Sequence, residues 1–342
     1  MKIGLAYDLK EEVPLSQSCP EDALEEYDSL ETVEAIALAL ESLGHSVVRL
    51  SGGKKFLTNI HQKNVDFVFN IAEGRGSYRS REAQIPAILE MLDIPYSGSD
   101  PQCLAICLDK PLTKKLVQTA GVCTPKWQVL TNGQQLEEIS TDNFTFPAFI
   151  KPACEGSSKG IRLACRVEDP EQLRKIATSL LEQYQQPVMV EEFIPGDEVT
   201  VGIVGNSPPQ IVGIMRILPK KEDRHFVYSL EVKRDWQHLV EYECPARIET
   251  EALHRLSDFS LKAFESLRCR DFARLDFRLS PDGMPYFLEI NPLAGLNPRS
   301  SDLPIMAAKM GCDYRALIAS ILSAALARQP ERLATSGTKR IC

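Results

Sequence analysis

The chain of 342 residues contains no run approaching the ~18 uncharged apolar residues that a membrane-spanning helix needs. Its first residues, MKIGLAYDLK, have no apolar core followed by a cleavage site, so we expect no signal peptide, a cytoplasmic location and no membrane partner. A cationic surplus is also missing, since 39 Lys and Arg stand against 47 Asp and Glu, a net charge of -8. Nucleic acids select basic surfaces, so we expect no nucleic-acid partner.

Common catalytic and metal-binding signatures are absent too. The sequence has no C-x-x-C pair, no zinc signature, no G-x-S-x-G elbow and no G-x-x-x-x-G-K-[ST] phosphate loop. Its ten cysteines are scattered, so we expect reduced thiols. Cys103 and Cys107 lie four apart on a predicted helix with no histidine nearby, and we expect them to be small core residues.

The chain does have an alternation of strands and helices near its start. Strands at 2–7, 46–50 and 66–70 alternate with helices from Leu30 and over 82–93, which predicts a parallel α/β sheet. The acidic residues 8–27 are expected to form a loop or lid. The length implies several domains, and we place them at 1–105, 106–205 and 206–328, followed by a tail at 329–342.

A predicted hairpin carries the densest group of candidate ligands. Two alternating runs, 273–279 and 285–290, are joined by Pro-Asp-Gly. Glu289 and Asn291 are two apart and share a strand face, and Asp276 could pair across from them. Three hard oxygen ligands can hold Mg²⁺ beside a nucleotide; the alternative is that these are solvent-facing strand residues.

Further groups suit a nucleotide, although each has a plainer explanation. The loop at 154–160 follows a strand at 147–151, and its glycines, serines and lysine could bind phosphate or form an ordinary turn. Carboxylates at 191, 192 and 198 could accept from adenine and ribose or be surface charge. Lys233 and Arg234, at the end of a strand-like YSLEVK, could stabilise phosphoryl charge or be a solvated basic pair.

Six segments together resemble the ATP-grasp superfamily, specifically the D-alanine–D-alanine ligases. In order they read IPYSGSD (94–100), LDKPLTKKL (108–116), PAFIKPACEGSSKGI (147–161), VEEFIPGDEVTVG (190–202), ARLDF (273–277) and LEINPLAGLNPRSS (288–301). The resemblance implies the ATP-grasp fold, a mixture of α/β and α+β: an N-terminal parallel α/β domain and two α+β subdomains that clasp ATP. It also implies an acid–amino-acid ligase that phosphorylates a donor carboxylate, joins it to an amine, and releases ADP and phosphate.

The resemblance also implies cofactors, partners and residue roles. The cofactors would be ATP and Mg²⁺ or Mn²⁺, normally two ions; the partners would be small-molecule substrates, with a homodimer possible. Arg274, Lys233 and Ser157 would be catalytic, and Asp276, Glu289 and Asn291 would bind metal. The nucleotide would contact Lys110, Lys151, Ser157, Ser158, Glu191, Glu192, Ile194, Glu198 and Lys233, and an amino-acid acceptor would contact Gly295, Ser300 and Ser301.

The first-domain pocket departs from the family pattern. Where the family has a Gly-Gly-x-Ser-x-Glu stretch after the first strand, this chain reads Tyr7 to Glu12, followed by an acidic insertion. Arg81 stands where a glutamate is expected, and Arg234 where a tyrosine is expected. Arginines there suit an additional carboxylate or hydroxyls on the donor. We therefore expect Arg81 and Arg234 to contact a changed donor, with the amino-acid acceptor retained.

Three alternatives to such a ligase stay open. One is condensation of an amino acid onto a cyclohexenone, as in the biosynthesis of mycosporine-like amino acids. Another is authentic D-alanine–D-alanine ligation. A third, from a different class, is an ATP-binding regulator without catalysis.

Overall fold

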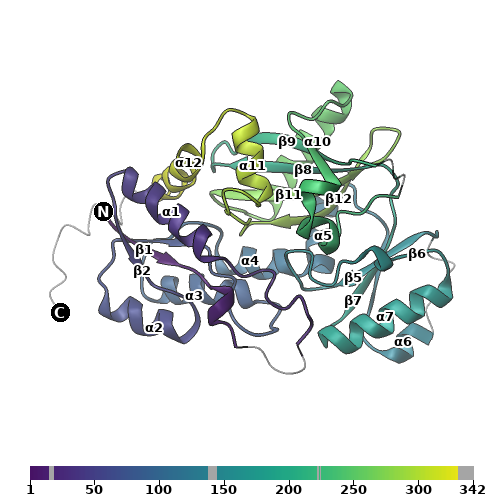
Figure 1. The fold of residues 1–342 in the computed structure, drawn as a ribbon, viewed down its shortest axis with the longest axis horizontal. Helices are drawn as coiled ribbons and strands as arrows, with labels where there is room; N and C mark the ends of the chain where they lie inside the picture. Colours follow the sequence, from purple (N-terminus) through teal and green to yellow (C-terminus); the bar gives the residue numbers. More distant parts are fainter. Residues whose placement is uncertain (15–18, 138–144, 222, 224, 330–342) are drawn as a thin grey trace.

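The computed structural model describes residues 1–14, 19–137, 145–221, 223 and 225–329. Residues 15–18 of the predicted loop and 330–342 of the predicted tail lie outside this set. Three sheets organise the molecule (Figure 1). One is parallel and lies in the N-terminal part, and the other two are antiparallel and face each other across a cavity. This mixture of α/β and α+β parts confirms the predicted fold class.

The N-terminal sheet has the strand order β2-β1-β3, with both pairings parallel. Its strands are β1 Lys2–Ala6, β2 Ser46–Arg49 and β3 Phe67–Asn70. The connecting elements are η1 Lys10–Glu12, α1 Leu30–Ser42, α2 Gly53–Gln62, η2 Arg81–Ala83 and α3 Gln84–Met91. The predicted helix 82–93 is thus a 3₁₀ turn followed by an α-helix. After it, Tyr96 forms an isolated parallel bridge with Val68.

The central sheet has the order β4-β7-β5-β6 and is antiparallel. Its strands are β4 Trp127–Leu130, β5 Ala148–Pro152, β6 Arg166–Val167 and β7 Val188–Glu192. The helical elements of this part are α6 Gly133–Glu137, η4 Leu163–Cys165 and α7 Pro170–Tyr184. Asp169 caps α7 through its side chain and Pro170 occupies the first turn, so local sequence signals set the start of this helix.

The C-terminal sheet has the order β10-β9-β8-β11-β12. Its strands are β8 Asp197–Val204, β9 Gln210–Pro219, β10 Val240–Glu243, β11 Phe272–Leu279 and β12 Pro285–Asn291. Its core is shared with α4 Pro101–Leu108, α5 Lys110–Thr119 and α10 Thr250–Ser266. The short helices α8 Leu230–Arg234 and α9 Trp236–Leu239 precede β10. Lys233 and Arg234 therefore end a helix, not the predicted strand.

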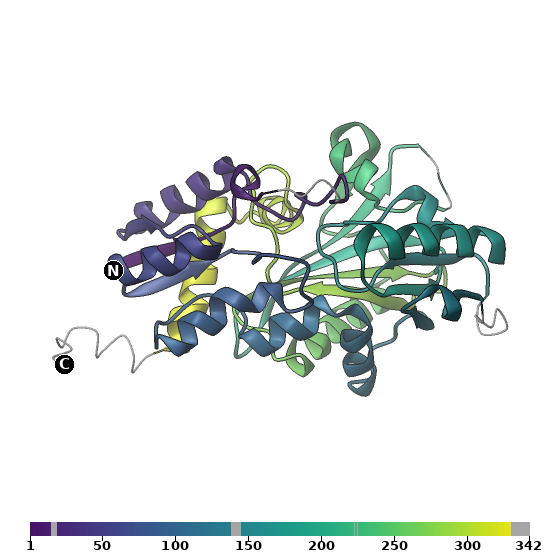
Figure 2. The same cartoon turned by 90° about the horizontal axis from the view of Figure 1, so that it is seen from below.

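The last two helices join the N-terminal and C-terminal parts. They are α11 Asp302–Lys309, which the sequence analysis missed, and α12 Tyr314–Ala327. Apolar side chains of α12 share a core with β1 and α1, so the last described helix packs against the N-terminal part of the molecule (Figure 2). No single described helix is long and apolar enough to cross a membrane; α11 and α12 pass that test only as a pair, bent by 111°.

Candidate active site

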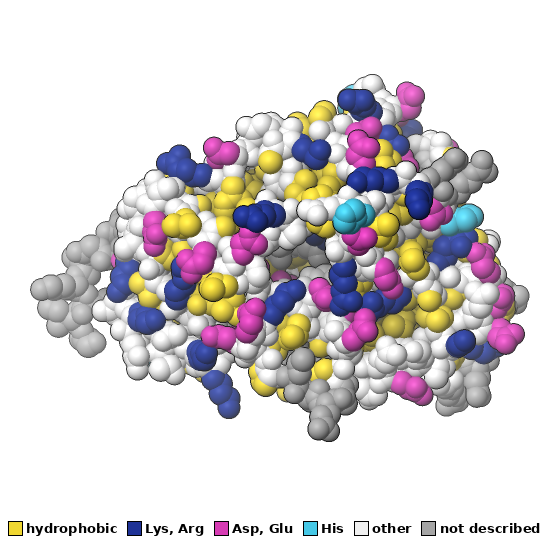
Figure 3. Space-filling model, in the orientation of Figure 1, with side chains coloured by type: hydrophobic (Ala, Val, Ile, Leu, Met, Phe, Trp, Pro, Cys, Tyr) yellow, Lys and Arg dark blue, Asp and Glu magenta, His cyan; other side chains and the backbone are white. Residues whose placement is uncertain are grey.

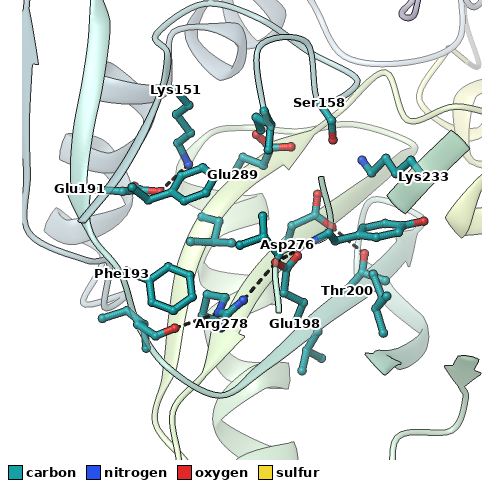
Figure 4. A pocket seen from close by; sticks show the side chains of 18 of the residues that line it. Lys151, Ser158, Glu191, Phe193, Glu198, Thr200, Lys233, Asp276, Arg278 and Glu289 are labelled. Atoms are coloured by element: carbon teal, nitrogen blue, oxygen red, sulfur yellow. Dashed lines mark hydrogen bonds and ion pairs between the residues drawn. The ribbon is translucent and has the colours of Figure 1, made fainter. Parts of the chain in front are cut away.

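Two adjoining cavities bring most of the predicted residues together. The inter-sheet cavity lies between the two antiparallel sheets, and Figure 4 shows the side chains that line it. The acidic cavity, about 390 Å³, lies between the segment 25–32, the Gly/Ser loop and the chain after β12. Arg274 lines both cavities, so one guanidinium stands at their junction. On the face shown in Figure 3 a hollow opens near the middle, among side chains of both charges.

The hairpin carboxylates meet as the strand pattern predicted. Asp276 on β11 lies directly opposite Glu289 on β12. The Asn291 amide donates to Asp276 at 3.2 Å and to Glu289 at 3.3 Å. Thr200 on β8 donates to the other Asp276 oxygen at 2.7 Å. Two carboxylates and an amide within mutual hydrogen-bonding reach form the hard-oxygen donor set that a divalent cation takes.

Cations surround these carboxylates. Arg274 Nη2 lies 2.8 Å from Asp276, and Lys110 Nζ lies 3.0 Å from Glu289. Burial opposes ionisation of Glu289, but the charges of Lys110 and Lys151 outweigh it and lower the pKa of this carboxyl. Glu289 therefore stays ionised near neutral pH, as a metal ligand must be.

A buried charge chain positions Lys151. Its ammonium group lies 2.6 Å from Glu191 Oε1, and the Lys114 ammonium lies 3.0 Å from Oε2 of the same carboxylate. Lys114 also donates to Thr124 at 2.7 Å and to the Phe287 carbonyl at 3.0 Å. Burial lowers the pKa of Lys114 to about 8, against the attraction of Glu191. Glu191, predicted to contact adenine, thus holds two lysines; Lys114 lies one helical turn beyond Lys110 and was missed.

The Gly/Ser loop spans the two cavities. Ser157 lines the acidic cavity and Ser158 the inter-sheet cavity. Both have left-handed backbones, with φ of 50° and 59°, which is a strained state for serine and is characteristic of binding loops. Lys110 donates to the carbonyl of Glu155 in the same loop. Of the predicted phosphate groups, Lys151 therefore lines the inter-sheet cavity and Lys110 the acidic cavity, and the loop borders both.

The predicted adenine and ribose residues also line the inter-sheet cavity: Glu192, Ile194 and Glu198. Arg278, missed by the sequence analysis, connects them. Its guanidinium donates to the Ile194 carbonyl at 2.9 Å and to Glu198 at 3.1 Å, and lies over the Phe193 ring at 4.7 Å. Arg278 follows Asp276 by two residues on the same strand face, so strand periodicity could have found it.

The two cations of α8 have different positions. Lys233 lines the inter-sheet cavity, and its ammonium group lies 4.9 Å from the Tyr228 ring centre. Figure 4 shows it entering from the side of the cavity opposite Lys151. Arg234 points elsewhere and pairs with Glu25 at 2.7 Å, with nearly half of its side chain exposed. The expected contact between Arg234 and the donor is not supported by this position.

Arg81 is likewise turned away from substrate. Its side chain is 1% exposed and does not line either cavity. It donates to Glu26 at 2.6 Å, to Glu155 at 3.0 Å and to the Cys154 carbonyl at 3.0 Å. Lys159 completes this network with both carboxylates. The expectation that Arg81 adds positive charge to the donor pocket needs correction, because Glu26 and Glu155 neutralise its charge. Glu26 lies 55 residues away in the sequence, so the local sequence around Arg81 did not reveal this contact.

Unpaired acids remain in the acidic cavity. Glu73 and Glu82 both line it, and neither has a cation within salt-bridge distance among the described residues. Burial, followed by mutual repulsion with other acids, raises the pKa of Glu73 well above its ordinary value. Burial raises the pKa of Glu82 to about 7 and, together with Asp8, that of Asp28 to about 7. Carboxyl groups therefore outnumber the cations Lys10, Lys110 and Arg274 in the lining of this cavity.

The three predicted acceptor residues lie in the segment between β12 and α11. Gly295, Ser300 and Ser301 all line the acidic cavity. The Ser301 hydroxyl accepts from the Asn297 backbone N–H at 3.0 Å, and a side chain at Gly295 would come within 2.8 Å of that hydroxyl. Since Ser301 is the N-cap of α11, free helix N–H groups are close by, as suits a carboxylate.

Comparison with known proteins identifies D-alanine–D-alanine ligases as relatives of this chain. The family model for the D-ala D-ala ligase C-terminus matches residues 116–323. The D-alanine–D-alanine ligase of Aquifex aeolicus (strain VF5) is 36% identical over 297 residues, covering 86% of this chain and 94% of that protein. The uncharacterized protein y4sG of Sinorhizobium fredii (strain NBRC 101917 / NGR234) is 33% identical over 303 residues, with 85% and 86% covered.

Solved structures resemble the whole architecture. The D-alanine–D-alanine ligase of Bacillus anthracis complexed with ATP aligns with a TM-score of 0.74 and 25% identity, covering 97% of this chain and 99% of that one. The VanG D-Ala:D-Ser ligase of Enterococcus faecalis aligns with a TM-score of 0.73, with 95% and 99% covered; at 22% identity this likeness concerns the fold alone.

Proposed function

Because the chain belongs to the D-alanine–D-alanine ligase family, we propose that it joins two amino acids in an ATP-dependent reaction, and that its donor carries an ammonium group. The first substrate's carboxylate would be phosphorylated and then attacked by the amine of the second. The observation that carries the choice of donor is the excess of unpaired carboxylates in the acidic cavity.

The chain's own residues divide the work between the two cavities. Lys110, Lys151 and Lys233 would hold the ATP phosphates, and Arg274 would stabilise oxyanion charge where the cavities meet. Asp276, Glu289 and Asn291 would hold Mg²⁺ or Mn²⁺, as two ions shared between their side-chain oxygens. Bound there, such cations neutralise the charge that develops on the transferring phosphoryl group.

An ammonium-bearing donor explains the cavity better than the alternatives. Buried carboxylates without a cation are costly, and a substrate ammonium group would offset that cost. A cyclohexenone or an extra carboxylate on the donor would leave Glu73 and Glu82 without a partner. The intact lysine, arginine and carboxylate set around Glu289 argues for catalysis over an ATP-binding regulator.

The direct test is phosphate release with ATP and Mg²⁺ over a panel of neutral, basic and acidic amino acids of both stereochemistries, singly and in pairs. We expect release with neutral or diamino donors. Release that requires a donor without an amino group, such as a cyclohexenone or dicarboxylic acid, would contradict the proposed donor. Bound ATP with no release under any condition would contradict the enzyme itself.

Glu82→Gln provides a test that separates binding from folding. It removes the carboxylate charge next to a substrate ammonium group, so we expect KM for the donor to rise about tenfold with a smaller change in kcat. The pKa of Glu82 is about 7 in the folded chain, against an ordinary value of 4.5. The contribution of this side chain to the free energy of unfolding is therefore fully present below pH 4.5 and is lost as pH rises through 7. At pH 8 the variant should therefore melt no lower than the wild type.

The same acids predict the pH profile. Asp28 and Glu82 gain protons as pH falls from 8 to 6, which removes negative charge from the cavity, so KM for the donor should rise over this range. KM for ATP should change less. Glu41→Gln, on the exposed surface of α1, serves as the control and should leave both constants unchanged. A flat donor KM together with a lower melting temperature for Glu82→Gln would assign these acids a structural role.

A further inference from the structure

Three buried thiols meet beside the acidic cavity. Cys103 and Cys107 lie on α4, and Cys269 lies between α10 and β11. Cys103 Sγ is 3.8 Å from Cys107 Sγ and 3.6 Å from Cys269 Sγ, and all three sulfurs lie within 4.8 Å of one another. Their exposed fractions are 2%, 4% and 7%. The proposed ligase reaction uses none of these three thiols.

The sulfur spacing matches shared coordination of one ion. Zinc–thiolate bonds are about 2.3 Å, so two sulfurs at tetrahedral angles around one zinc lie about 3.8 Å apart. The separations of Cys103 Sγ from the other two sulfurs, 3.8 and 3.6 Å, agree with that value. Cysteines that only fill space in a core have no reason to place their sulfur atoms next to one another, yet Cys103 and Cys269, 166 residues apart in sequence, do so.

The surroundings favour a thiolate at this point. Cys103 occupies the first turn of α4, where the helix dipole stabilises negative charge, and its N–H donates to the capping Asp100 at 2.8 Å. Arg270, next to Cys269, pairs with Asp100 at 2.7 Å and adds a cation nearby.

An ion has a route to the cluster, because Cys107 also lines the acidic cavity. We propose that Cys103, Cys107 and Cys269 form a binding site for a thiophilic cation of the Zn²⁺ or Cu⁺ kind. Three metal–sulfur bonds replace three S–H bonds, and the protons leave to solvent without any change of oxidation state. The thiolate set selects such soft or borderline ions over the hard cation expected at Asp276.

An ion bound at the cluster would lie next to two segments that carry active-site residues. Cys107 precedes Lys110 by three residues, and Cys269 precedes β11, which carries Arg274 and Asp276. An ion would therefore fix the segment leading to a phosphate lysine against the segment leading to the hairpin. We expect one bound ion to raise the melting temperature of the chain and to change its turnover.

The binding test uses the full chain, reduced and stripped of metal. Zn²⁺ is titrated in competition with a chromogenic chelator, and Co²⁺ is added separately to detect sulfur-to-metal charge-transfer absorption. We expect one ion per chain. Cys103→Ser and Cys269→Ser should each weaken binding by at least about 100-fold. Cys312→Ser, which removes a thiol outside the cluster, should leave affinity and absorption unchanged.

A second measurement needs no substitution and so does not depend on folded variants. Alkylation of the native wild-type chain, mapped by mass spectrometry, should slow at the three cluster thiols when Zn²⁺ or Cu⁺ is present, but not at Cys312. Three results would each overturn the proposal. The first is the absence of stoichiometric binding, and the second is binding that survives in folded Cys269→Ser. The third is recovery of a Cys103–Cys269 disulfide in place of the thiols. None of these readouts depends on the ligase substrates, so the ion site and the proposed function can fail separately.

Discussion

Asp276→Asn is expected to reduce ATP-dependent phosphate release by about 1,000-fold or more while leaving nucleotide affinity within about tenfold of the wild type. The carboxylate provides a charged oxygen opposite Glu289 and also anchors Arg274 through two hydrogen-bonding nitrogens. An amide keeps the shape but loses the charge that a divalent cation and the guanidinium both need. Turnover is measured under saturating ATP and substrates, and nucleotide affinity by equilibrium binding.

The hairpin offers its own control for that experiment. Asp282 lies at the exposed turn between β11 and β12, where it accepts from the Ser280 hydroxyl. Asp282→Asn makes the same chemical change on the same hairpin and should leave turnover within about twofold of the wild type. If the Asp276 variant kept more than a tenth of wild-type turnover, the metal role assigned to this carboxylate would be wrong.

Arg274→Lys should lower kcat by about 100- to 1,000-fold with the chain still folded. Lysine retains the positive charge between Asp276 and Asp302 but cannot reproduce a planar fork that donates to Asp276 at 2.8 and 3.1 Å while lying 3.3 Å from Asp302. The loss should fall mainly on kcat, because the guanidinium acts on charge that develops during reaction. Steady-state kinetics and the thermal unfolding midpoint, taken together, check this.

Arg255→Lys on the exposed side of α10 is the matched control for Arg274→Lys and should behave as the wild type. An increase in KM alone for Arg274→Lys would indicate a ground-state binding role at the junction of the cavities. A large fall in the unfolding midpoint would indicate that the residue mainly balances the charges of Asp276 and the buried Asp302.

Local patterns in the sequence predicted those parts of the site that depend on local geometry. Strand periodicity placed Asp276, Glu289 and Asn291 together because all three lie on one hairpin with a clear turn. The same periodicity failed at Lys233, where YSLEVK alternates like a strand. Ser229 accepts from the N–H of Val232, however, and begins a helix there. A capping signal was present and was outweighed by the alternation.

The misplaced arginines show what a single sequence cannot supply. Arg81 was interpreted by its position in a motif, which predicts where a residue lies but not what neutralises it. Its partners, Glu26 and Glu155, come from segments 55 and 74 residues away. Because charge in a buried site depends on the whole network, a motif position alone could not predict that Arg81 is neutralised by buried acids.

The segment 19–29 has a consequence for how specificity could change in this family. It supplies Glu25, Glu26 and Asp28 to the acidic cavity, and Asp22 fastens it to the Gly160 N–H at 2.9 Å and to Tyr184 at 2.7 Å. The proposed metal and phosphate groups come instead from β5, β11, β12 and α5. Part of the carboxylate lining of the acidic cavity thus comes from a stretch of chain separate from the proposed phosphoryl-transfer groups. We expect exchange of this segment to alter donor preference, while Glu73 and Glu82 stay in place to face the donor's ammonium group.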